Sequence, residues 1–265
     1  MAAGLYPLYR RALSLRTCAW PWLLVAMFSP ATAHADTSLH AHEVIKLFAF
    51  KTRLDDDSYR DTLQLRYYHP LRYNDMHQAT LRLDAGFYQN NHRSPPDFSL
   101  TDLHLANVRF TLSAKGAQLG EHWQSTFGLR AILPVGSSNQ FVLAPQVGAI
   151  YRPQSAADGF FTDFSPLLRY LHGMDPKDDS AERLRKVEFY PTLGFQLSHN
   201  TKLRLWDEYG IQYNSRDGRW FVPIDLMLIH RLAEHQHLSV GVSKGINKSY
   251  TQYDWSLYGS LNFYF

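Results

Sequence analysis

The chain has 265 residues, of which 45% are hydrophobic and 14% aromatic, and its formal net charge is +3. This composition excludes a disordered chain, and no run approaches the roughly 18 apolar residues of a spanning helix. The whole net charge comes from Arg10, Arg11 and Arg16, because residues 1–35 contain no acidic residue. The rest of the chain has 24 basic and 24 acidic residues, so charge gives no reason to expect a nucleic-acid partner.

Residues 1–35 have the features of a secretory signal peptide. The three arginines precede a short apolar core, Cys18–Phe28, and the small-x-small pattern Ala33-His34-Ala35 follows it. We predict cleavage between Ala35 and Asp36, which leaves one domain over residues 36–265. Since Cys18 is the only cysteine, the exported protein would have no disulfide and no cysteine-based site. The alternative is a buried N-terminal helix.

From Glu43 onward, apolar and polar residues alternate with a period of two, which is typical of β-strands with one apolar face. About twelve such segments follow one another. They begin near Val44, Arg60, Met76, Leu100, His122, Gln140, Phe161, Val187, Thr201, Trp220, His237 and Tyr253. Most span roughly 10 to 14 residues, whereas strands of soluble proteins average about 5 to 6 and tilted membrane-spanning strands need about 9 to 11.

The connections between the segments differ in length. With an even number of strands and both termini in the periplasm, the two longest connections, Gln89–Ser99 and His172–Lys186, fall on the extracellular side. The very short His199-Asn200 falls on the periplasmic side, as in bacterial barrels. The sequence therefore predicts an all-β fold, a transmembrane antiparallel up-and-down β-barrel of about 12 strands, with 10 to 14 compatible.

The last segment, residues 253–265, ends in a terminal aromatic residue with apolar residues at alternate positions, namely Leu261, Phe263 and Phe265. It resembles the closing strand of Gram-negative outer-membrane β-barrel proteins. The resemblance implies a place in the cell outer membrane among its lipids and lipopolysaccharide. It also implies that the outer-membrane assembly machinery recognises these three residues.

A soluble periplasmic β-sandwich or lipocalin-like barrel would also alternate, but with its apolar face inward. Strand length favours the membrane barrel. So does the supply of 16 Tyr, 16 Phe and 6 Trp, many of them near segment ends, where interface girdles lie.

If the apolar face meets lipid, the charged residues of the other face line the lumen. These are Arg66, Arg82, Asp84, Arg109, Arg130, Glu188, Arg204, Glu208, Asp225 and Asp254. Opposed rows of five arginines and five acids would favour small polar or zwitterionic solutes in a water-filled passage. The main expectation is a narrow, passive, porin-like channel. The alternative is a structural or surface-interaction barrel whose lumen is closed by ion pairs.

The alternation breaks in a few places. The apolar parity changes between Leu105 and Ala106, which predicts a β-bulge near Leu105. Asp207 falls on the lipid-facing parity, which is costly without a bulge. Prolines inside candidate strands cannot donate a ladder hydrogen bond; they are Pro145, Pro166, Pro191 and Pro223.

Two short patterns resemble other barrels. His92-Arg93-Ser94, followed by Asn107, resembles the His-x-Ser and Asn of outer-membrane phospholipases of the A type. There, His would take the serine proton and Asn would orient the imidazole. Pro95-Pro96 replaces the family's Asn-Gly after the serine, so a lipid-modifying hydrolase is the alternative function and a solvated loop the simpler interpretation. Residues 133–146 resemble a strand–turn–strand pattern of barrels linked to uptake of aromatic compounds, from which we infer no substrate.

We predict no cofactor and no dedicated metal site. Acidic residues in two outer loops could hold Ca²⁺ or Mg²⁺ at the lipopolysaccharide surface, although solvated loop charge is the default interpretation. These residues are Asp55, Asp56, Asp57, Asp175, Asp178 and Asp179.

Overall fold

The computed structural model describes residues 42–74, 77–91, 99–153, 159–174, 176, 183–249 and 253–265. The predicted signal peptide and its cleavage positions, Ala35 and Asp36, lie outside this part of the protein and remain predictions.

Thirteen strands and one short 3₁₀ turn, Leu100–Asp102, make up the regular structure of the described residues. The strands are β1 (Val44–Arg53), β2 (Tyr59–Asn74), β3 (His77–Asn91), β4 (His104–Leu119), β5 (Trp123–Ile132), β6 (Phe141–Tyr151), β7 (Phe161–Met174), β8 (Arg185–Ser198), β9 (Thr201–Leu205), β10 (Ile211–Asn214), β11 (Arg219–Ala233), β12 (Gln236–Lys248) and β13 (Trp255–Tyr264). Each predicted segment corresponds to a strand whose first residue lies within four positions of the prediction.

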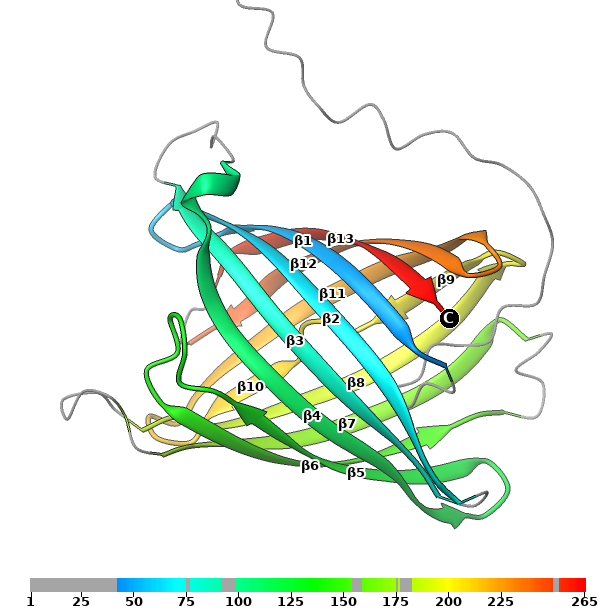
Figure 1. The fold of residues 1–265 in the computed structure, drawn as a ribbon. Helices are drawn as coiled ribbons and strands as arrows, with labels where there is room; N and C mark the ends of the chain where they lie inside the picture. Colours follow the sequence, from blue (N-terminus) through cyan, green and yellow to red (C-terminus); the bar gives the residue numbers. More distant parts are fainter. Residues whose placement is uncertain are drawn as a thin grey trace, which may run out of the picture.

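The sheet closes on itself. β1 pairs antiparallel with β13 over ten residues, from Val44 opposite Tyr264 to Arg53 opposite Trp255. β9 and β10 both lie between β8 and β11, so together they form one interrupted strand of the barrel. With β9 and β10 counted as one strand, the fold is a closed, antiparallel barrel of twelve strands (Figure 1). The predicted fold class is confirmed.

The strands alternate in direction, so the connections gather at two ends. β3 ends at Asn91 and β7 at Met174 on the same end of the barrel, where β4 begins at His104 and β8 at Arg185. We call this end the long-loop rim. The opposite end holds the two-residue connections 199–200 and 234–235 and the C-terminus of the protein (Figure 1).

Within the part of the sequence that the structure describes, no helix combines the length and apolar character needed to cross a membrane.

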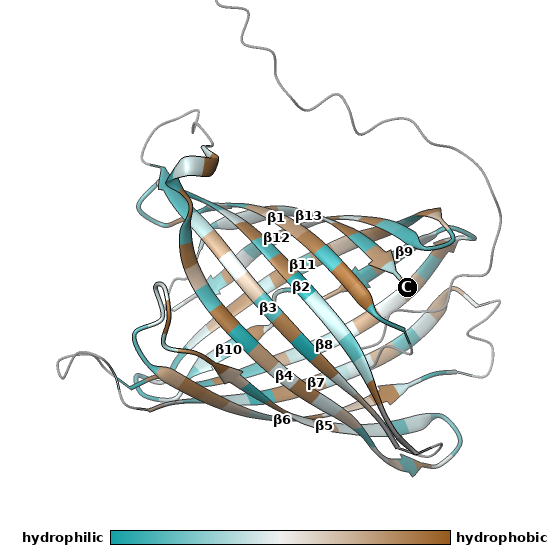
Figure 2. Ribbon diagram, in the orientation of Figure 1, coloured by the Kyte–Doolittle hydropathy of each residue, from teal (hydrophilic) through white to brown (hydrophobic). Residues whose placement is uncertain are grey.

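Apolar and polar residues alternate along the strands (Figure 2), and the exposures show that the apolar side chains face outward and the polar ones inward. On the outer face, Leu65 and Leu129 expose 45% and 47% of their surface, whereas the neighbouring Arg66 and Arg130 on the inner face expose 5% and 6%. A soluble barrel with an apolar interior has the reverse arrangement, so the soluble alternative does not fit this fold.

Aromatic side chains pair across neighbouring strands at both ends of the barrel. Tyr213 and Trp220 lie at the long-loop rim, with ring centroids 4.7 Å apart. At the other end Trp123 and Tyr151 are 5.1 Å apart. Such belts are expected where a barrel meets the two lipid–water interfaces.

The irregularities of the alternation correspond to specific distortions. Between β3 and β4, Gly86 lies opposite Asn107 and Phe87 opposite Leu105, so Ala106 is an extra residue and the predicted bulge is confirmed. Pro166 lies directly opposite Pro191. Neither proline has an N–H to donate to the ladder, so both missing donors fall at one place between β7 and β8.

The segment that begins at Thr201 was expected to be one continuous strand, and this expectation is wrong. The pairing of β9 with β8 and β11 ends at Leu205 and resumes at Ile211 in β10. The intervening residues, Trp206–Gly210, leave the wall and turn into the lumen. We call them the inward segment. Asp207 is thereby removed from the lipid face, which resolves its unfavourable parity.

Candidate functional site: a basic cavity in the lumen

Asp225 on β11 holds the inward segment. Its Oδ2 accepts hydrogen bonds from the backbone N–H groups of Asp207, Glu208 and Tyr209 at 3.1, 3.1 and 3.2 Å. Its Oδ1 accepts a hydrogen bond from the Tyr258 hydroxyl at 2.7 Å. Hydrogen bonds to a carboxylate are about twice as strong as neutral ones, so one acidic side chain fixes three consecutive backbone amides.

Trp206 begins the inward turn with φ of 51°, in the left-handed region. This conformation costs roughly 1–2 kcal/mol for a residue with a Cβ. Its indole Nε1 donates to the Pro223 carbonyl and its own carbonyl accepts from the Thr192 hydroxyl, both at 2.8 Å. These bonds to β11 and β8 anchor the residue where the strand pairing is interrupted.

Glu208, at the tip of the inward segment, makes an ion pair across the lumen. Arg66 donates from Nη1 and Nη2 to its two carboxylate oxygens at 2.8 and 2.9 Å. Arg66 belongs to β2, which lies five strand positions from the inward segment in this twelve-stranded barrel. The pair is thus a strut that joins nearly opposite walls, and Arg66 also donates from Nε to Asp84 at 2.8 Å.

Tyr209 fills the side of the lumen bounded by β1 and β11–β13. Its ring packs 5.0 Å from Tyr253 and 5.6 Å from Tyr258, and its hydroxyl lies 2.8 Å from the Ser256 hydroxyl. Met227 and Phe50 belong to the same apolar cluster. This side is packed with side chains, so the open space lies toward β2–β8.

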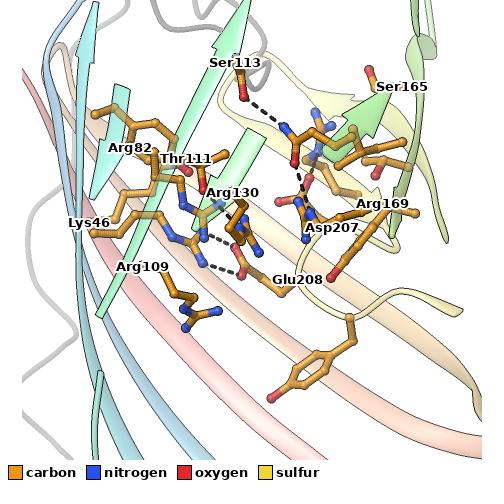
Figure 3. A pocket seen from close by; sticks show the side chains of 18 of the residues that line it. Lys46, Arg82, Arg109, Thr111, Ser113, Arg130, Ser165, Arg169, Asp207 and Glu208 are labelled. Carbon is orange, nitrogen blue, oxygen red and sulfur yellow. Dashed lines mark hydrogen bonds and ion pairs between the residues drawn. The ribbon is translucent and has the colours of Figure 1, made fainter. Parts of the chain in front are cut away.

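Four consecutive strands each place an arginine on the inner wall: Arg66, Arg82, Arg109 and Arg130, on β2, β3, β4 and β5. We call them the arginine row, of which Figure 3 labels Arg82, Arg109 and Arg130. The strand register produces it, since Arg66 lies opposite Asp84, Asp84 opposite Arg109, and Thr111 opposite Arg130. Asp84 accepts hydrogen bonds from two arginines of the row, from Arg66 Nε and from Arg82 Nε, each at 2.8 Å.

Further arginines on β7 and β9 are paired with acids. Arg169 Nη1 lies 3.0 Å from Glu188 Oε2. Arg204 Nε lies 2.7 Å from Asp207 Oδ1, and its Nη2 lies 3.4 Å from Asp163. Neither Arg169 nor Asp163 was among the residues predicted to line the lumen. Arg169 alternates with Leu168 and Tyr170 of the outer face and could have been found from that signal, whereas a register shift between Phe161 and Asp163 changes the face of Asp163.

These side chains surround a cavity of about 340 Å³. Seven basic residues line it: Lys46, Arg66, Arg82, Arg109, Arg130, Arg169 and Arg204. Only Asp207 and Glu208 among its lining residues are acidic. The sequence suggested a balance of five arginines and five acids. The cavity is instead strongly basic, because Asp84, Glu188 and Asp225 bond to their neighbours in the wall and do not line it.

Of the predicted lumen residues, Arg66, Arg82, Arg109, Arg130, Arg204 and Glu208 line this cavity together. Asp254 does not. It precedes β13 at the long-loop rim, where its carboxylate lies 3.8 Å from Arg53.

Arg109 and Arg130 differ from the rest of the arginine row. Among the described residues, neither has a carboxylate within ion-pair distance. Arg130 donates from Nε to Thr111 at 2.9 Å, and Arg109 donates from Nη2 to Gln64 at 3.3 Å. The Nε of Arg109 is buried without a hydrogen-bond partner in the described structure.

The hydrolase hypothesis stays a prediction, because His92 and Ser94 lie outside the described residues. Asn107 lies on β4 opposite Gly86. Its Oδ1 is buried and has no partner among the described groups.

The loop acids give no metal site in the described structure. Asp56 accepts hydrogen bonds from Ser58, and Asp57 pairs with Arg53. No group of three His, Cys, Asp or Glu side chains arranged for a metal ion occurs in the described part of the protein. Asp175, Asp178 and Asp179 lie outside it.

The proposed assembly residues lie on the closing strand. Leu261 and Phe263 lie opposite Leu47 and Ile45 of β1, and the backbone N–H of Phe265 donates to the Glu43 carbonyl at 3.0 Å. Their recognition by the assembly machinery remains a prediction.

No protein-family model matches the chain, and no curated protein matches its sequence. Solved structures do match. An outer-membrane channel from Pseudomonas putida F1 has a TM-score of 0.67 at 10% identity, covering 90% of this chain and 100% of that one. The NanC porin has a TM-score of 0.53 at 10% identity and the KdgM porin 0.51 at 11%, each covering 84% of this chain and 99% of theirs. The likeness is one of fold: this protein has the fold of the outer-membrane β-barrel proteins.

Proposed function

We propose that the protein is a narrow, passive channel of the outer membrane that admits small solutes and favours anions. The observation that carries the proposal is the basic cavity, with its seven basic and two acidic lining side chains inside a closed barrel.

The size of the solute follows from how the lumen is filled. The inward segment and the aromatic cluster around Tyr209 occupy one side, and about 340 Å³ remains beside the arginine row. This volume lies near the lower end of small-molecule sites, which span roughly 300–1,000 Å³. Twelve strands also lie between the filled eight-stranded barrels and the open sixteen-stranded porins. Both considerations favour small solutes.

The sign of the preference follows from charge. Rings of Arg and Lys favour anions in pores, and the low dielectric of a narrow wall strengthens their field. Anions therefore concentrate in this cavity, whereas cations meet an excess of positive charge.

The comparisons support a channel of this kind. Two of the similar folds are porins, and one structure shows the KdgM porin in complex with disordered oligogalacturonate, an acidic sugar. The apolar outer face and the predicted signal peptide support a place in the outer membrane.

Planar-bilayer recording tests the channel. Purified protein inserted into a lipid bilayer should give discrete conductance steps that are absent with detergent alone. Complete absence of steps at every voltage would contradict the channel.

That outcome would favour the second candidate function, a structural barrel with a closed lumen. The specific observation in its favour is the Arg66–Glu208 strut, which ties nearly opposite walls together.

A further inference from the structure

We propose that Arg109 and Arg130 form a binding site for one carboxylate or phosphate group of a small anion. The inference deepens the proposed function, because the anion would reach the site through the lumen. It is nevertheless a separate claim, since a site can bind an anion in a barrel that does not conduct.

Neither of these two residues has a direct ion-pair partner within the described protein. Arg130 exposes only 6% of its surface, and neither guanidinium has a described carboxylate within ion-pair distance. A buried charge without a partner is strongly destabilising. The buried Nε of Arg109 also lacks an acceptor. An anion in the cavity would supply the missing ion-pair partner.

The register brings the two side chains to one place on the wall. Arg130 lies opposite Thr111, and Arg109 precedes Thr111 by two positions on the same face of β4. Diagonal neighbours of this kind are about 7–8 Å apart at Cα, within reach of long side chains. Both residues line the cavity (Figure 3).

The other arginines of the cavity are already engaged. Arg66 binds Glu208, Arg169 binds Glu188, and Arg204 binds Asp207. Their geometry shows what the wall offers an anion, because Arg66 holds the Glu208 carboxylate with two parallel bonds. Arg109 and Arg130 offer the same planar forks, which match carboxylate and phosphate geometry.

The rest of the cavity suits a polar body on the anion. The hydroxyls of Thr111, Ser113 and Thr126 and the amide of Gln146 line the same space. A small sugar acid or hydroxy acid would meet hydrogen-bonding groups there, whereas a long hydrocarbon tail would not.

Isothermal titration calorimetry on the purified, folded barrel in detergent tests the site. Glucuronate is the probe and glucose, which lacks the carboxylate, is its matched control. Inorganic phosphate tests the anionic group alone. We expect saturable binding of glucuronate and phosphate, and none of glucose.

The variants Arg109→Gln and Arg130→Gln should each weaken glucuronate binding at least tenfold, and the double variant should abolish it. Arg219→Gln, which removes a charge from a side chain 58% exposed at the long-loop rim, should bind as the wild type does. The heat-dependent shift in gel mobility that folded barrels show checks that each variant is folded. If a variant does not fold, Arg109→Lys and Arg130→Lys replace it and should weaken binding by losing the fork while keeping the charge.

Unchanged binding in the folded double variant, or no glucuronate binding by the wild type, would overturn the site. The two claims fail separately. Binding without conductance would leave the site in place and remove the channel, whereas conductance without saturable binding would remove the site and leave the channel.

Discussion

Replacing Glu208 by glutamine separates the two roles that the structure gives this residue. The substitution preserves the side-chain volume. It removes one of the two acidic charges of the cavity and one of the two acceptors of the Arg66 fork. We expect a higher ratio of anion to cation permeability, together with a larger conductance because the strut across the lumen is weakened.

The magnitude follows from Coulomb's law and from the burial of the pair. For an anion roughly 8 Å from Glu208, at an effective dielectric constant of about 40, the lost repulsion is about 1 kcal/mol, or about fivefold in anion occupancy. Breaking a buried ion pair lowers the free energy of unfolding by about 3–5 kcal/mol. Arg66 keeps its bond to Asp84, so the lower end of that range applies.

The assay is single-channel recording with a potassium chloride gradient across the bilayer. Two variants serve as controls. Glu208→Asp keeps the charge but shortens the side chain, so it should raise conductance while leaving the permeability ratio within about twofold of the wild type, since the Coulomb term is retained. Asp217→Asn removes an acidic charge from the β10–β11 turn, outside the cavity, and should change neither quantity.

The permeability ratio decides the outcome. If Glu208→Gln leaves the ratio unchanged, or shifts it toward cations, then Glu208 does not face the path of the ions and the reasoning fails.

Three further predictions concern the architecture around the cavity. Asp225→Asn weakens three bonds to backbone amides by about 1 kcal/mol each, so hydrogen exchange at Asp207–Tyr209 should accelerate about 100-fold by mass spectrometry, and unchanged exchange would contradict its anchoring role. Gly241→Ala places a methyl group against the Tyr258 ring and should lower the free energy of unfolding by about 1–3 kcal/mol; an unfolding midpoint equal to that of the wild type would argue against this packing. Leu129→Lys puts a charge on the lipid face and should cost about 2–4 kcal/mol near the midplane, measured by guanidinium unfolding in lipid vesicles, and no cost would mean that Leu129 does not meet lipid.

The barrel itself was predictable because alternation encodes it directly. A strand with one face in lipid and one in the lumen has to alternate, as Leu65 and Arg66 do, so the segments and the bulge near Leu105 could be read from parity.

The inward segment was not predictable in this way. Its cause is Asp225, which lies 16 to 18 residues further along the sequence and accepts three backbone N–H groups. Parity flagged Asp207 as misplaced but could not show that the backbone leaves the wall there.

The imbalance of charge in the cavity could not be predicted from the sequence either. Counting inward-facing charges gave equal numbers of arginines and acids. Only the register shows that Asp84 and Glu188 are covered by their partners while Arg109 and Arg130 face the cavity without a carboxylate within ion-pair distance among the described residues. Facing direction is a property of one strand, whereas pairing is a property of several.

The zero-current potential of the wild-type channel under a potassium chloride gradient tests the central claim most directly. An arginine-lined lumen predicts a potential whose sign shows that chloride crosses more readily than potassium. A potential of the opposite sign, or a bilayer that carries no current, would contradict it.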